Sequence, residues 1–190
     1  MRWKLNKILN KFKGLFSSDQ ASCRIVEINT SSQEVVFHFK YKAVFLRCKL
    51  TEAIADLSVI DNLIPWEACW LGGYYGRALR ASIEGREALK KAKRMSFLLK
   101  NNRGRYRIVF QNRTGEIGYF DQKTKQEFIE HPLTVANNEH IISEFDPSQA
   151  CYIGILAGIS MEKTLSSDKK TGEKQLETLI NKPPKLRIVK

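Results

Sequence analysis

The sequence predicts a single α+β domain in which a mostly antiparallel sheet packs with three to four helices. Its 190 residues, 43% of them hydrophobic, are enough to bury the core of one domain. Apolar residues alternate with polar ones in several short segments and recur every three to four residues in longer ones, so both strands and helices are expected. The expected order is a helix, strands, three helices, strands, a helix and a tail, which is typical of the α+β class.

Three parts are expected along the chain. Residues 1–20 form a basic amphipathic helix and a linker, residues 21–163 form the α+β core, and residues 164–190 form a mobile basic tail rich in Ser, Lys and Thr. No apolar run is long enough for a signal peptide or for a membrane span, which needs about 20 residues. We therefore do not expect an integral membrane protein.

The first 16 residues carry five basic residues and no acidic one. At 100° per residue, the large apolar residues fall on one helix face that lysines flank. Such a helix can lie on an anionic membrane surface, or it can dock on its own domain or on a partner protein, and the sequence leaves these alternatives open. The residues predicted to dock are Leu5, Ile8, Leu9, Phe12, Leu15 and Phe16.

Alternation with a period of two predicts strands at 23–28, 35–41 and 44–50. A polar segment at 29–32 joins the first two as a hairpin. Thr51 then begins a helix that is expected to continue to about residue 62.

Two helices carry small residues at four-residue spacing. The first is expected from Trp66 to about Ile83, and the second begins at Asp146-Pro147-Ser148-Gln149, which has the order of an N-cap, a first-turn proline and a capping-box glutamine. Interior glycines weaken a helix by about 1 kcal/mol each, so their repetition favours a close contact between these two helices. A buried strand at 151–159 is the alternative. The residues predicted to make the contact are Ala68, Gly72, Gly76, Ala150, Gly154 and Gly158.

Residues 77–107 hold eleven basic residues against Glu84 and Glu87, a net charge of +9. An amphipathic helix at 86–100, a turn at 101–104 and a strand at 105–110 are expected there, followed by strands near 117–121 and 126–130. Side chains on this segment could neutralise phosphates. The candidates are Arg86, Lys90, Lys91, Lys93, Arg94, Arg103, Arg105 and Arg107.

These features predict a non-enzymatic accessory protein that binds the backbone of DNA or RNA. A peripheral membrane protein or an assembly adaptor, docked by residues 1–16, is the alternative. An enzyme is the less favoured class, and no cofactor or metal is expected, because no zinc-ligand spacing or phosphate-loop motif is present and the acidic-x-lysine pattern at Asp121 and Lys123 is typical of a hairpin turn. The four cysteines are expected to be free and buried in a reducing compartment. We therefore expect the protein in the cytoplasm, either free or at the inner face of a membrane.

Overall fold

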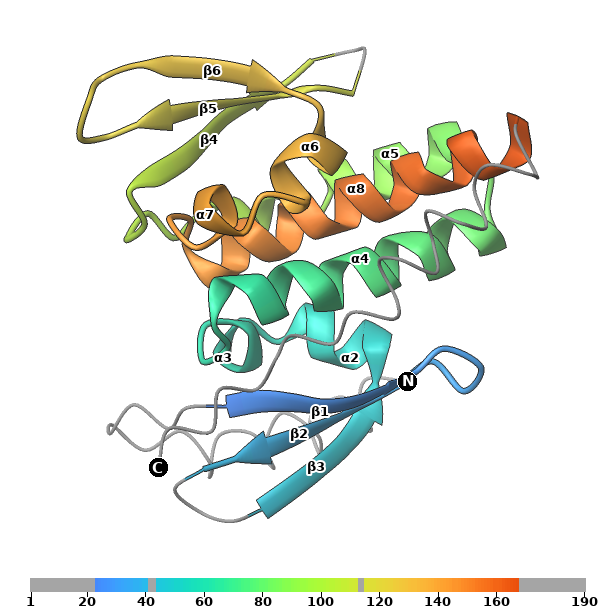
Figure 1. The fold of residues 1–190 in the computed structure, drawn as a ribbon. Helices are drawn as coiled ribbons and strands as arrows, with labels where there is room; N and C mark the ends of the chain where they lie inside the picture. Colours follow the sequence, from blue (N-terminus) through green and yellow to red (C-terminus); the bar gives the residue numbers. More distant parts are fainter. Residues whose placement is uncertain (1–22, 41–43, 113–114, 168–190) are drawn as a thin grey trace.

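The computed structural model describes residues 23–40, 44–112 and 115–167. The α+β class is confirmed, but the prediction of one sheet with three to four helices is wrong. The described part contains two three-stranded antiparallel sheets, seven α-helices and one 3-10 helix. The strands form two separate sheets because the helical layer lies between them (Figure 1).

Sheet A contains β1 (Cys23–Asn29), β2 (Glu34–Phe39) and β3 (Val44–Lys49), in that order. All three strands were predicted, although β2 ends two residues earlier than expected. Val35, Phe37 and Phe39 alternate along β2 and are almost completely buried. Sheet A therefore packs through one face on the helices.

One helix was predicted after β3, but the structure has two, α2 (Leu50–Ala55) and α3 (Leu57–Ile60). They are separated at Asp56, which has an extended backbone with φ −106° and ψ 97°. Its carboxylate accepts hydrogen bonds from the backbone N–H and the hydroxyl of Ser58. Asp56 thus caps α3, which explains why the helix does not continue.

Two long helices, α4 (Pro65–Ser82) and α8 (Pro147–Ser167), pack along each other at the centre of the molecule (Figure 1). The helical interpretation of 151–159 is therefore the right one, and the strand alternative is wrong. A Cβ atom at Gly72 would overlap the carbonyl of Cys151, and one at Gly154 would overlap the carbonyl of Cys69. Gly76 and Gly158 face the carbonyls of Ile155 and Gly73 in the same way. Ala68 and Ala150 are fully buried.

The predicted helix at 86–100 is shorter in the structure. It divides into α5 (Gly85–Lys93) and the 3-10 helix η1 (Ser96–Leu99), with Met95 donating to the carbonyl of Ala92 in the tight turn between them. The turn lets Leu98 reach the core, where it is fully buried. Two short helices, α6 (Pro132–Ala136) and α7 (Glu139–Ile142), were not predicted.

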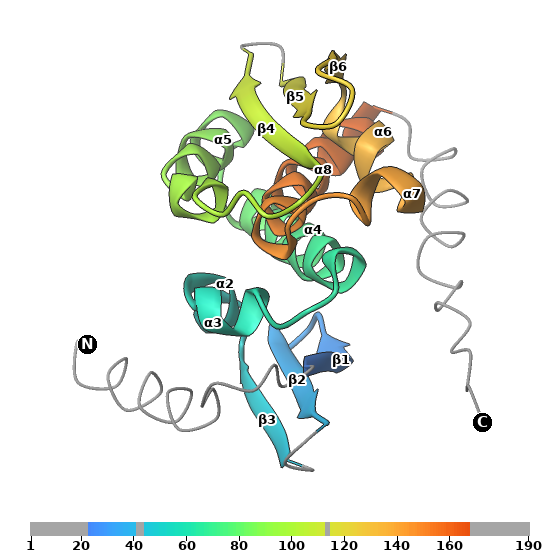
Figure 2. The same cartoon turned by 90° about the vertical axis from the view of Figure 1, so that its left-hand side faces the viewer.

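Sheet B contains β4 (Tyr106–Gln111), β5 (Ile117–Asp121) and β6 (Glu127–Glu130). Its inner face carries a cluster of aromatic rings from Tyr106, Tyr119 and Phe128, which Phe145 completes. In both views sheet A and sheet B lie on opposite sides of the helical layer (Figures 1 and 2). No helix within residues 23–40, 44–112 or 115–167 combines the length and the apolar composition that crossing a bilayer requires.

Candidate nucleic-acid interface

The basic residues of α5 and its C-cap lie on the solvent side of the helix. Ala88 and Ala92 are fully buried on the other side, and α5 packs on α8. Four-residue spacing of these alanines fixes which face of the helix points inward. We call the exposed set the α5 basic face, and it consists of Arg86, Lys90, Lys91, Lys93 and Arg94.

Most charges of the α5 basic face have no acidic partner among the described residues. Lys90 forms an ion pair with Glu87 at 2.7 Å, and its hydrogen bond lowers the pKa of the Glu87 carboxyl. Among the residues that the structure describes, the other four basic side chains of the face form no ion pair. These four side chains are exposed to solvent.

The structure does not bring the three downstream arginines onto this face. Arg105 donates three hydrogen bonds to Asp121, two from Nε and one from Nη2, which lies 2.7 Å from Oδ2. The Asp121 side chain is only 2% exposed, and its carboxylate compensates the charge of Arg105. Arg107 is exposed and opposes Phe120 across the sheet. Arg105 is thus the weakest of the predicted phosphate ligands.

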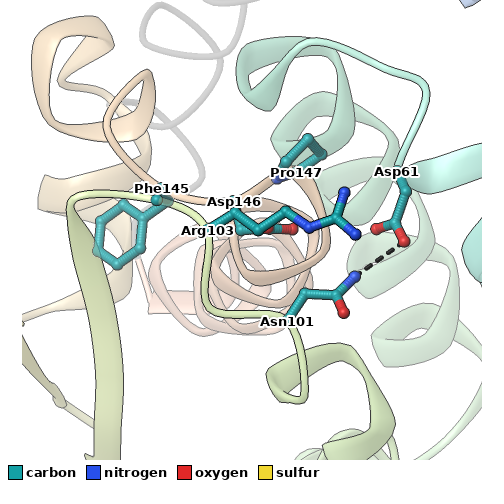
Figure 3. Close-up of a pocket in the computed structure, with 7 residues that line it drawn as sticks. Asp61, Asn101, Arg103, Phe145, Asp146 and Pro147 are labelled. Atoms are coloured by element: carbon teal, nitrogen blue, oxygen red, sulfur yellow. Dashed lines mark hydrogen bonds between the residues drawn. The ribbon is translucent and has the colours of Figure 1, made fainter. Parts of the chain in front are cut away.

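Arg103 lies at a small pocket of about 260 Å³ beside the first turn of α8. Figure 3 shows its side chain extending toward Asp61, whose carboxylate accepts a 2.8 Å hydrogen bond from Asn101. The pKa of Asp61 is raised, because burial and the nearby Asp146 outweigh the Asn101 hydrogen bond and the charge of Arg103. Two carboxylates at the pocket disfavour an anion, so Arg103 would contact a phosphate only from the pocket rim. The seven described lining residues include no histidine, cysteine or hydroxyl side chain.

A buried amide fixes the segment that carries Arg103. The Gln149 Oε1 accepts from the backbone N–H of Ile108 at 2.8 Å, and its Nε2 donates to the carbonyl of Asn101 and to the Asn102 side chain. The predicted capping-box role of Gln149 is therefore wrong, because its amide reaches outward to β4 and to residues 101–102. Its position three residues after Asp146 was the only sequence signal, and it indicated a local partner.

The four cysteines and Asp121 are engaged in the core and in a turn of the described structure. All four cysteines are free and buried, and burial raises the pKa of the Cys69 thiol to about 12. Asp121 binds Arg105 and caps the turn by accepting from the backbone N–H groups of Lys123 and Thr124. Within the described ranges, no three His, Cys, Asp or Glu side chains gather closely enough to hold a metal ion.

The predicted docking face of the N-terminal segment lies outside the described residues, as does the tail beyond Ser167. Helix α8 continues three residues past the expected start of that tail. The docking residues concerned are Leu5, Ile8, Leu9, Phe12, Leu15 and Phe16.

Comparison with known proteins adds no functional assignment. No family model matches the chain, and no curated protein or solved structure matches it either.

Proposed function

We propose that the protein binds nucleic acid through phosphate contacts of the α5 basic face and acts as a non-enzymatic accessory protein. The observation that carries this proposal is the exposure of five basic side chains on one short helix and its C-cap, only one of which has an acidic partner among the described residues. Buried Ala88 and Ala92 hold the helix so that these charges point to solvent. Phosphates attract such a surface without regard to base sequence.

The test is the salt dependence of binding to a fluorescent 20-base-pair duplex and to a 20-nucleotide single strand. Log affinity should fall linearly with log salt concentration, with a slope that gives the number of phosphates contacted. Lys91→Glu/Arg94→Glu should weaken binding at least tenfold at about 0.1 M salt and reduce the slope by about one per lost contact.

The matched control is Lys40→Glu/Arg47→Glu, which changes the net charge equally at two exposed positions, one directly after β2 and one on β3. If both double variants weaken binding to the same extent, net charge alone causes the binding and the α5 assignment is wrong. Binding to anionic vesicles without any binding to nucleic acid would overturn the proposal in favour of the membrane role predicted for residues 1–16.

A further inference from the structure

The outer face of sheet B carries large apolar side chains that point away from the helices. Arg107, Phe120 and Glu127 form one row across the three strands, and Phe110, Gly118 and Ile129 form the next. Phe110 is 41% exposed and Ile129 is 60% exposed. All described helices lie on the other side of this sheet (Figures 1 and 2).

Phe110 has an unusual position on this face. A Cβ atom at Gly118 would overlap Cε1 and Cζ of the Phe110 ring, so the ring lies against the backbone of β5 where glycine leaves room for it. The pairing of β4 with β5 shifts between Ile108 and Phe110, and this irregularity accompanies the placement of the ring. Phe110 nevertheless remains 41% exposed, so part of its ring is accessible for stacking with another flat group.

Phe120 lies on the same face, two residues farther along β5. The Nζ of Lys125 is 5.9 Å from the centroid of its ring, and Arg107 opposes it on β4. Lys125 therefore lies near this ring, and Arg107 is its neighbour across the strands. A nucleotide has a flat aromatic base and a phosphate a short distance from it, so it is complementary to a phenyl ring with a cation nearby.

The charges on this face favour an anionic occupant. Arg107, Lys123 and Lys125 are exposed on the face or at its β5–β6 turn, and Glu127 is their acidic counterpart there. The remaining acidic groups of β5 and β6 are engaged on the inner side, where Asp121 binds Arg105 and Glu130 accepts from the Tyr119 hydroxyl.

We infer that the outer face of sheet B is a stacking platform for single-stranded nucleic acid, with Phe110 and Phe120 against bases and Arg107 and Lys125 near phosphates. This inference rests on the proposed function and names its substrate class. A duplex keeps its bases stacked inside and cannot offer them to these rings, whereas single strands can. The α5 basic face adds backbone contacts common to both forms.

The test is binding of the full chain to a fluorescent 20-nucleotide single strand and to the matching duplex, across a salt series. Phe110→Leu/Phe120→Leu keeps apolar side chains but removes the aromatic faces. It should weaken single-strand binding about tenfold or more for each ring, with the salt slope and the duplex affinity unchanged. Phe110→Trp/Phe120→Trp should retain single-strand binding.

Phe45→Leu is the matched control, because Phe45 is a 64% exposed phenylalanine on sheet A. Near-wild-type thermal unfolding of every variant establishes that the fold is kept. Unchanged single-strand binding of the leucine double variant, with binding still lost in Lys91→Glu/Arg94→Glu, would overturn the platform and leave the proposed function standing. Absence of binding to both nucleic acids at low salt would overturn both. Equal losses on single strand and duplex would also rule out stacking.

Discussion

Asp121 and Glu67 are two buried carboxylates that each pair with an arginine, yet their pKa values move in opposite directions. Hydrogen bonds from Arg105 hold the pKa of Asp121 well below its ordinary value. The hydrogen bonds that Asp121 accepts from backbone N–H groups of the turn add to this effect. Burial raises the pKa of Glu67 despite its hydrogen bond from Arg24. The Glu67 Oε2 has no hydrogen-bond partner among the described residues. Hydrogen bonds thus outweigh burial in setting the pKa of Asp121, whereas burial outweighs them in setting the pKa of Glu67.

Asp121→Asn should destabilise the protein in a way that depends on pH. Because the pKa of Asp121 is lower in the folded state than in the unfolded chain, its carboxylate stabilises the fold above about pH 4. This contribution is lost as the pH falls from there toward the folded-state pKa. Urea unfolding should therefore show a less stable variant at pH 7 and a shrinking difference from wild type below pH 4.

Glu67→Gln is the control for that experiment. The raised folded-state pKa of Glu67 means that its ionisation lowers the free energy of unfolding as the pH rises from about 4 through that pKa. The variant should thus be no less stable than wild type at pH 7. A loss in Asp121→Asn that is the same at every pH would mean that the charge of Asp121 does not matter.

At the scale of elements, the contact between α4 and α8 depends on glycines that face carbonyl groups of the opposite helix. Carbonyl groups of α8 lie against Gly72 and Gly76, and carbonyl groups of α4 lie against Gly154 and Gly158. The helix backbones therefore approach each other more closely than side chains would allow. Cα–H···O contacts are expected at such a distance.

Gly76→Ala should destabilise the fold by about 1–3 kcal/mol, because its methyl group would overlap the Ile155 carbonyl. Gly73→Ala on the same helix is the matched control, since its methyl group would lie 3.9 Å from the nearest atom, the carbonyl oxygen of Gly154. It should be neutral or stabilising by up to about 1 kcal/mol, because alanine is the better helix former. Chemical denaturation of both variants measures the difference. Equal effects would show that close approach is not what these glycines provide.

The sequence predicted most elements but not the partners of their polar side chains. Alternation along β2 and the spacing of Ala88 and Ala92 report which side of an element is buried, so both elements were found. The break between α2 and α3 depends on the Asp56 side chain, which accepts from Ser58 and caps α3. The sequence pattern fitted one continuous helix equally well. The net charge of residues 77–107 could be read from the sequence. The ion pair between Arg105 and Asp121, however, depends on the pairing of β4 with β5. Nothing local in the sequence specifies that pairing.

The whole molecule has two sheets joined through one helical layer. Sheet A packs on it through Phe37 and its neighbours on β2, and sheet B contributes Ile117 and Tyr119 from the opposite side. These side chains belong to one continuous core cluster. We therefore expect the two sheets to unfold together.

Phe37→Leu in sheet A and Ile117→Val in sheet B test this expectation. Each substitution should lower the free energy of unfolding by about 1 kcal/mol, and the two effects should add in the double variant because the sites are distant. Far-UV circular dichroism and tryptophan fluorescence should report the same single urea transition for every variant. Separate transitions, each shifted by only one substitution, would mean that the sheets belong to independently folding units.

The position of α8 in the chain has a consequence for biosynthesis. Residues 151–159 of α8 are all buried, yet α8 is the last described element to leave the ribosome. Until then, α4 and α5 lack the surface of α8 on which they pack in the folded protein. The nascent chain thus carries both sheets without the helix that lies between them. We therefore expect the core to form only after α8 has been translated, with apolar surfaces of the earlier elements exposed until then.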